Sequence, residues 1–211
     1  MAFHKDGEDK YRYRCKDCAG STKVSIPIVS KWYERCRNFA IQYNENRDEK
    51  IGGRAQTVQV DEMVVGRRKY NVGRQRLTNW VLGIIQTVGE KRGQVSLSLI
   101  QNRGAASIIP VTRRNVEQGT LGLTDGLRKY QRLPNYGYLH QFVNHKENIV
   151  DPVTQVNTQT IERLWRSVRT SFPVYGMRRL KLNGYLQAFS YKRNNGQQNF
   201  EQFLTDLSLL M

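Results

Sequence analysis

Residues 57–65 read TVQVDEMVV, a β-branched and apolar run that carries two adjacent acids. Residues 80–88 (WVLGIIQTV) and 94–101 (QVSLSLIQ) have the same character, and the GEKRG loop at 89–93 suits a hairpin between them. Apolar runs of this length, bounded by Gly and polar residues, are typical of strands. The three segments therefore predict the antiparallel start of a sheet.

Helical and strand patterns alternate outward from this core. Apolar residues recur at helical spacing in 28–46, 105–118, 158–172, 182–193 and 199–210, and short strand patterns occur at 119–124 and 138–143. This order predicts an α/β fold with a mixed sheet covered by helices. Composition divides the chain into a polar head (1–25), a helical segment (26–55) and one main body (56–211).

The charge balance points to a polyanionic partner. The 211 residues carry 34 Lys and Arg against 18 Asp and Glu, a formal charge of +16. Anionic membrane is the alternative, but the basic residues are interleaved with Tyr, Asn and Gly rather than set against an apolar helix face, which favours nucleic acid. The longest apolar stretch, residues 80–85, is too short to cross a bilayer, and no apolar signal segment opens the chain. We expect an intracellular protein without a membrane partner.

Cys15 and Cys18 form a Cys-x-x-Cys pair, which is half of a zinc ribbon. A complete Zn²⁺ site would have to use His4 and Cys36, the remaining nearby ligands, at unusual spacing. The pattern favours a remnant of such a module, or an exposed loop, over a formed zinc site.

Three acids lie where metal-dependent phosphoryl transfer would need them. Asp61 interrupts a Val-rich strand and projects from the face opposite Val58 and Val60, Asp125 ends a predicted strand, and Glu162 lies in the first turn of a predicted helix. Each also has a structural interpretation: an exposed edge residue, an Asp-Gly turn, and an acid favoured by the helix dipole. Spacing alone leaves both interpretations open.

Several ordered motifs resemble one family over residues 24–208. The segments VQVDE (58–62), GRRKYN (66–71), GR (73–74) and WVLG (80–83) are similar to the start of the catalytic domain of Merlin-superfamily DDE transposases and their bacterial ISXO2-like relatives. The segments GYLH (137–140), VNH (143–145), VDP (150–152), NTQTIERLW (157–165) and residues 173–193 resemble the second signature of this family. The chain departs from the family pattern in three places: it has only half of the zinc ribbon, it matches less well around Asp125, and it has Asn157 and Gln159 where many relatives have His and Asn.

The resemblance implies an RNase H-like mixed five-stranded sheet flanked by helices. It implies a DDE site formed by Asp61, Asp125 and Glu162, which would bind two Mg²⁺ or Mn²⁺ ions, with the basic Arg169 on the helix of Glu162. His145 would contact the scissile phosphate or orient a carboxylate, although a core or surface His remains the alternative. The implied partners are double-stranded DNA, as transposon ends and target, and further copies of the chain on that DNA. In a eukaryote the location would be nuclear.

Two groups of basic residues mark the expected DNA path. One is a loop after the first strand, for which a solvated charged loop is the alternative: Arg67, Arg68, Lys69, Arg74 and Arg76. The other lies on the helix of Glu162, where Arg166 and Arg169 follow at i+4 and i+7 and so share its face. The sequence also leaves open a transposase-derived DNA-binding protein without catalysis and an RNase H-like nuclease.

Overall fold

A mixed five-stranded sheet forms the centre of the computed structural model, which describes residues 2–5, 10–14, 21–65, 79–87, 93–143, 157–172, 179–196 and 200–208. Its strands are β4 (Thr57–Val65), β5 (Asn79–Thr87), β6 (Val95–Ile100), β7 (Leu121–Asp125) and β8 (Leu139–Val143), in the order β6-β5-β4-β7-β8. β4, β5 and β6 pair antiparallel, whereas β7 runs parallel to both β4 and β8. The α/β fold is the predicted one and is consistent with an RNase H-like sheet.

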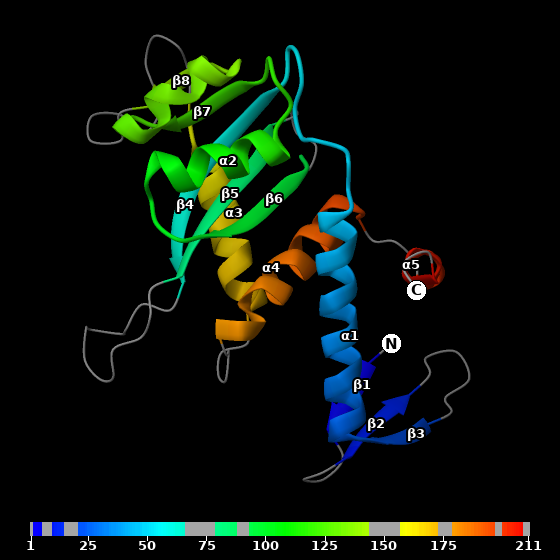
Figure 1. The fold of residues 1–211 in the computed structure, drawn as a ribbon. Coiled ribbons are helices and arrows are strands. Elements are labelled where there is room, and N and C mark those ends of the chain that lie inside the picture. Colours follow the sequence, from blue (N-terminus) through cyan, green and yellow to red (C-terminus); the bar gives the residue numbers. More distant parts are fainter. Residues whose placement is uncertain are drawn as a thin grey trace, which may run out of the picture.

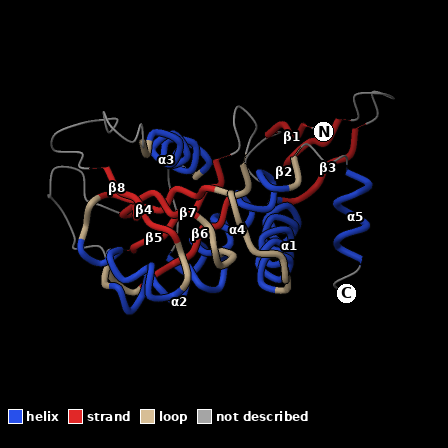
Figure 2. The backbone as a smooth tube through the Cα atoms, turned by 90° about the horizontal axis from the view of Figure 1, so that it is seen from above, coloured by secondary structure: helices blue, strands red, loops and turns tan. Residues whose placement is uncertain are grey.

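Helices cover both faces of this sheet (Figure 2). α2 (Ala105–Asn115) and the 3-10 helix η2 (Arg128–Tyr136) pack on one face, and α3 (Gln159–Ser171) and α4 (Arg179–Asn194) pack on the other. Alternation along β4 divides its side chains between these layers, because successive residues of a strand point to opposite faces. Val58 and Val60 join the α2 and η2 cluster, and Met63 and Val65 join the α3 and α4 cluster.

A long helix connects the central sheet to a smaller one (Figure 1). β1 (Ala2–Lys5), β2 (Lys10–Arg14) and β3 (Ser21–Ser25) form an antiparallel sheet at the start of α1 (Ile26–Glu45). α1 packs against α4, and α5 (Phe200–Ser208) closes an aromatic cluster on them. The rings of this cluster are Phe39, Tyr43, Tyr191 and Phe203.

Elements with a clear hydrophobic period lie within a few residues of their predicted bounds. Two parts were not predicted: the strands of the polar head and η2. In η2, Tyr130 and Leu133 are buried three residues apart, a 3-10 spacing within a mostly polar segment that an α-helical period does not detect. In the described part of the chain, no helix combines the length and apolarity that a membrane span requires.

Candidate active site

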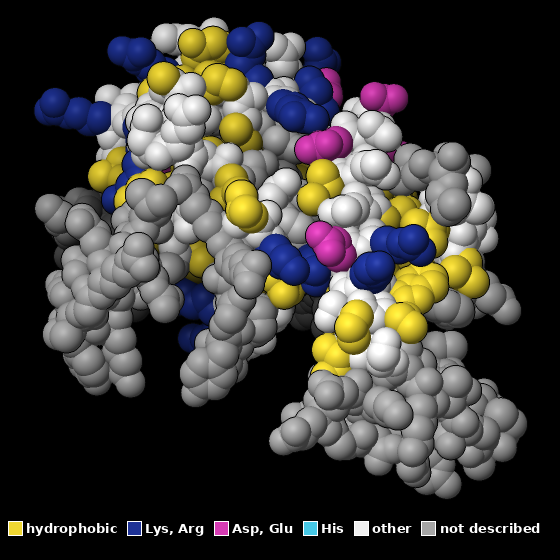
Figure 3. Space-filling model, turned by 60° about the horizontal axis from the view of Figure 1, so that its bottom comes forward, with side chains coloured by type: hydrophobic (Ala, Val, Ile, Leu, Met, Phe, Trp, Pro, Cys, Tyr) yellow, Lys and Arg dark blue, Asp and Glu magenta, His cyan; other side chains and the backbone are white. Residues whose placement is uncertain are grey.

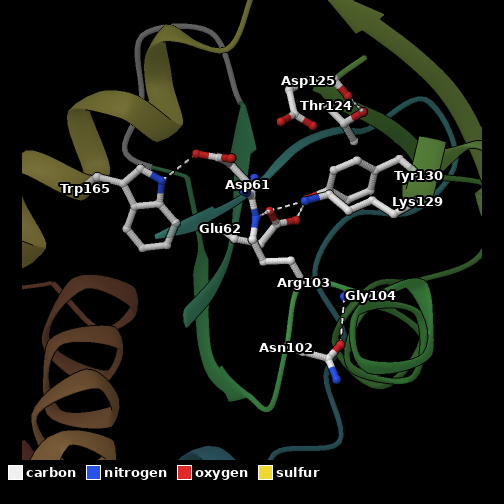
Figure 4. A network of polar contacts seen from close by, with 10 residues as sticks. All are labelled: Asp61, Glu62, Asn102, Arg103, Gly104, Thr124, Asp125, Lys129, Tyr130 and Trp165. Carbon is white, nitrogen blue, oxygen red and sulfur yellow. Dashed lines mark hydrogen bonds and ion pairs between the residues drawn. The ribbon is translucent and has the colours of Figure 1, made fainter. Parts of the chain in front are cut away.

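The parallel register of β4 and β7 brings Asp61 and Asp125 together. The strands pair Thr57 with Leu121 and Gln59 with Leu123. Asp61 and Asp125 each lie two residues after the last of these pairs. Because side chains alternate along a strand, both aspartates project from the same face of the sheet, on neighbouring strands that are about 4.8 Å apart. Figure 4 shows the two carboxylates near each other, beside α3. Since β4 is the central strand of the sheet, the alternative interpretation of Asp61 as an exposed edge residue is wrong.

Both aspartates are partly buried in the structure. Burial raises the pKa of Asp61, and hydrogen bonds from Trp165 and the Glu62 backbone oppose the rise. Burial also raises the pKa of Asp125; the Lys129 ammonium opposes this rise, while the charges of Glu62 and Asp61 add to it. Oδ1 of Asp125 is buried without a hydrogen-bond partner among the described residues. Asp61 is thus held by a hydrogen bond from Trp165, whereas Asp125 leaves a buried carboxylate oxygen without a partner in the described part of the chain.

Glu162 lies on the neighbouring helix rather than against the aspartate pair. Its side chain is exposed in the first turn of α3. Within the described ranges, no three His, Cys, Asp or Glu side chains lie close enough together to hold a metal ion. The structure therefore brings two of the three predicted acids together and places the third on the helix that covers their face.

Buried Gln59 attaches the start of α3 to β4. Its Nε2 donates to the carbonyl oxygen of Asn157 at 2.9 Å, and its Oε1 accepts from the backbone N–H of Ile161 at 2.8 Å. Ile161 is the third residue of α3, so Gln59 supplies an acceptor for one of the N–H groups that a helix leaves unpaired at its start. This role of Gln59 was not predicted from the sequence. The available signal was an amide two residues before Asp61, on the same face of a Val-rich strand.

We expect Gln59→Leu to destabilise the protein by about 1–3 kcal/mol, because it leaves the buried Ile161 N–H without an acceptor. The free energy of unfolding in urea measures this effect. Gln101→Leu is the matched control, since Gln101 is exposed. Equal effects of the two substitutions would contradict the role assigned to Gln59.

Glu62 points to the opposite face of β4 and is fully buried there. It forms an ion pair with Arg103 at 3.2 Å and a second with Lys129, and it accepts a hydrogen bond from the Tyr130 hydroxyl. Burial and the charge of Glu62 raise the pKa of Tyr130 well above its usual value, so the phenol remains a donor. This network fixes η2 and the loop before α2 behind the aspartate pair (Figure 4). The network was not predicted from the sequence, because each partner lies far from Glu62 in the chain.

Predicted DNA contacts are only partly within the described residues. Arg166 and Arg169 lie exposed on α3, on the side of Glu162. On the face shown in Figure 3, Lys and Arg side chains cover a wider area than Asp and Glu. The other predicted basic and zinc-binding residues lie outside the described ranges: Arg67, Arg68, Lys69, Arg74, Arg76, His145, Cys15 and Cys18.

The comparison with protein families identifies the family of the chain. The family model of the ISXO2-like transposase domain matches residues 51–194, which is more than half of the chain and includes Asp61, Asp125 and Glu162. The chain belongs to this DDE transposase family. The ISXO2-like domain thus spans the five-stranded sheet and α2 to α4, while β1 to β3 and α1 precede it and α5 follows it. No curated protein matches the chain.

Proposed function

We propose that this chain is a transposase catalytic domain that cleaves DNA strands and joins them to a target with the help of divalent metal. The observation that carries the proposal is the juxtaposition of Asp61 and Asp125, with a buried Oδ1 that has no partner among the described residues, inside an ISXO2-like transposase domain. The motifs at 137–165 support the finer assignment to the Merlin superfamily. Nuclear action in a eukaryotic host belongs to the same proposal.

The residues present fit a site for hard divalent cations. Carboxylate oxygens are the preferred ligands of Mg²⁺ and Mn²⁺, and Asp61 and Asp125 are partly buried, which raises the pKa of each carboxyl. In this proposal Asp61 and Asp125 hold the ions, and Glu162 completes the ligand set from α3. When bound, a pair of such ions would activate water or a DNA 3′-hydroxyl for attack and would stabilise the oxygen that leaves the phosphate.

The protein itself contributes position and charge. Gln59 holds the start of the helix that carries Glu162, and the network around Glu62 holds the chain that follows Asp125. The arginines of α3 provide cations beside the acids for the DNA backbone. We propose that the chain acts as a homo-oligomer on DNA, because two transposon ends must be held together for joining.

Replacing Arg166 and Arg169 is expected to lower the affinity for DNA and to make that affinity less sensitive to salt. Each phosphate contact contributes about −0.9 to the slope of log K against log salt concentration. In the variant carrying both Arg166→Gln and Arg169→Gln, the slope should therefore be less steep by about 1.8. Titration of duplex DNA at several salt concentrations measures the slope. Arg132→Gln is the control, since Arg132 is exposed on η2, which packs on the opposite face of the sheet. Slopes unaffected by the α3 substitutions would exclude these arginines from the DNA path.

The function is tested with DNA that carries the element's own terminal sequences, incubated with target DNA and with Mg²⁺ or Mn²⁺. We expect both cleaved ends and joined products, and neither in the presence of a chelator. Cleavage without joining would indicate a nuclease instead. Binding without cleavage would indicate a transposase-derived DNA-binding protein.

A further inference from the structure

A hydrogen bond between Trp165 and Asp61 lies within the apolar interface between α3 and the sheet. Trp165 is 5% exposed and packs in the cluster that includes Met63, Val81 and Leu164. Its Nε1–H donates to Oδ2 of Asp61 at 2.8 Å (Figure 4). A buried indole N–H requires an acceptor, and here the acceptor is one of the two paired aspartates.

Gly83 provides the room for this indole. It lies on β5 directly opposite Asp61 in the antiparallel register. A Cβ at this position would lie 2.4 Å from Cη2 of Trp165, so any larger residue would displace the ring. The indole is therefore held by its own helix, by a carboxylate of β4 and by the open backbone surface of β5.

The same contact sets the position of Glu162 along the sheet. Trp165 follows Glu162 by three residues, about one helical turn. Ile161, which directly precedes Glu162, is held by Gln59. Two side chains of β4, Gln59 and Asp61, thus form hydrogen bonds with α3 on either side of Glu162, the third predicted acid.

We propose that Trp165 is a positioning residue of the active site, acting through Asp61. Its N–H holds one oxygen of the Asp61 carboxylate, which sets the direction in which the other oxygen points, and it docks the helix of Glu162 at a set depth. This inference rests on the proposed function, in which Asp61 is a metal ligand. Hydrogen-bond partners of ligating carboxylates typically contribute 10–100-fold to metal affinity or activity.

Trp165→Phe tests the proposal, because it removes the N–H and keeps an aromatic ring over Gly83. We expect Mn²⁺ binding to the full chain, measured by calorimetry without DNA, to weaken by about 10-fold or more. Trp32→Phe is the matched control, since Trp32 is half-exposed on α1, and it should leave the affinity unchanged. Thermal unfolding of each variant establishes that it is folded.

Gly83→Ala provides a second test, because the added methyl displaces the indole without altering Trp165 itself. We expect it to weaken Mn²⁺ binding at least as much as Trp165→Phe. A Trp165→Phe protein with reduced thermal stability and wild-type Mn²⁺ affinity would show a purely structural role and overturn the proposal. A wild-type chain that binds no Mn²⁺ would instead remove the proposed function, and this inference with it.

Discussion

Asp61→Asn is expected to lower the proposed metal-dependent strand cleavage by at least about 10³-fold, since even outer-shell substitutions typically cost 10–100-fold and this one removes the charge of a proposed ligand. Asn keeps the shape of the side chain and an oxygen that can accept from Trp165, so the fold should persist. Asp125→Asn should have a similar effect, because the two carboxylates share one face at the same level of adjacent strands. Single-turnover cleavage of end-containing DNA with Mg²⁺ measures both.

Asp48→Asn is the matched control for these substitutions, because Asp48 is exposed outside the sheet. Duplex binding should be kept in all three variants, since the proposed phosphate contacts come from the basic residues and not from the acids. Cleavage at the wild-type rate by either active-site variant would remove the metal-site assignment.

Glu62→Ala should destabilise the protein by about 3–5 kcal/mol, because removing the carboxylate leaves the Lys129 ammonium buried and uncompensated. The Glu62 side chain is 0% exposed, and that of Lys129 only 11%. The variant also leaves the Tyr130 hydroxyl without its acceptor. Urea unfolding followed by circular dichroism measures the loss.

Glu49→Ala is the control, since it removes an ion pair with Arg47 from a side chain that is 79% exposed, and it should cost no more than about 1 kcal/mol. Combining Glu62→Ala with Lys129→Met should destabilise less than the sum of the single effects, because the second change removes the charge that the first leaves unpaired. If Glu62→Ala cost no more than Glu49→Ala, the buried network would not be the support described above.

Much of the fold was predicted from local signals. Val58 and Val60 share a face by strand alternation, and Asp61 was correctly predicted to project from the other face, because this depends only on the two-residue period of a strand. The helix at residues 158–172 was predicted from its apolar period, and Ile161, Leu164 and Val168 are buried along it. Where no such period exists, as in η2, the prediction missed the element.

The candidate site depends on contacts between segments that are far apart in the chain. Trp165 lies in a segment predicted to be helical, and nothing near it in the chain indicates that its N–H meets Asp61, 104 residues away. Gln59 likewise meets Ile161 across 102 residues. Glu62 was one of two adjacent acids, and alternation separates them: Asp61 projects toward α3 and Glu62 into an ion cluster. A hydrogen-bond partner is set by which elements pack together, and periodicity reports only the face from which a residue projects.

The sequence by itself determined the strands of the central sheet, the main helices, the basic character of the chain and the elements that carry the three acids, because these depend on residue type and spacing along one segment. Only the tertiary structure decided that Asp61 and Asp125 lie side by side, since that follows from the register of two strands separated by 55 residues of chain between Val65 and Leu121. It also decided that Trp165 and Gln59 attach the helix of Glu162 to β4, because pairing across the sheet brings these side chains within reach of their partners.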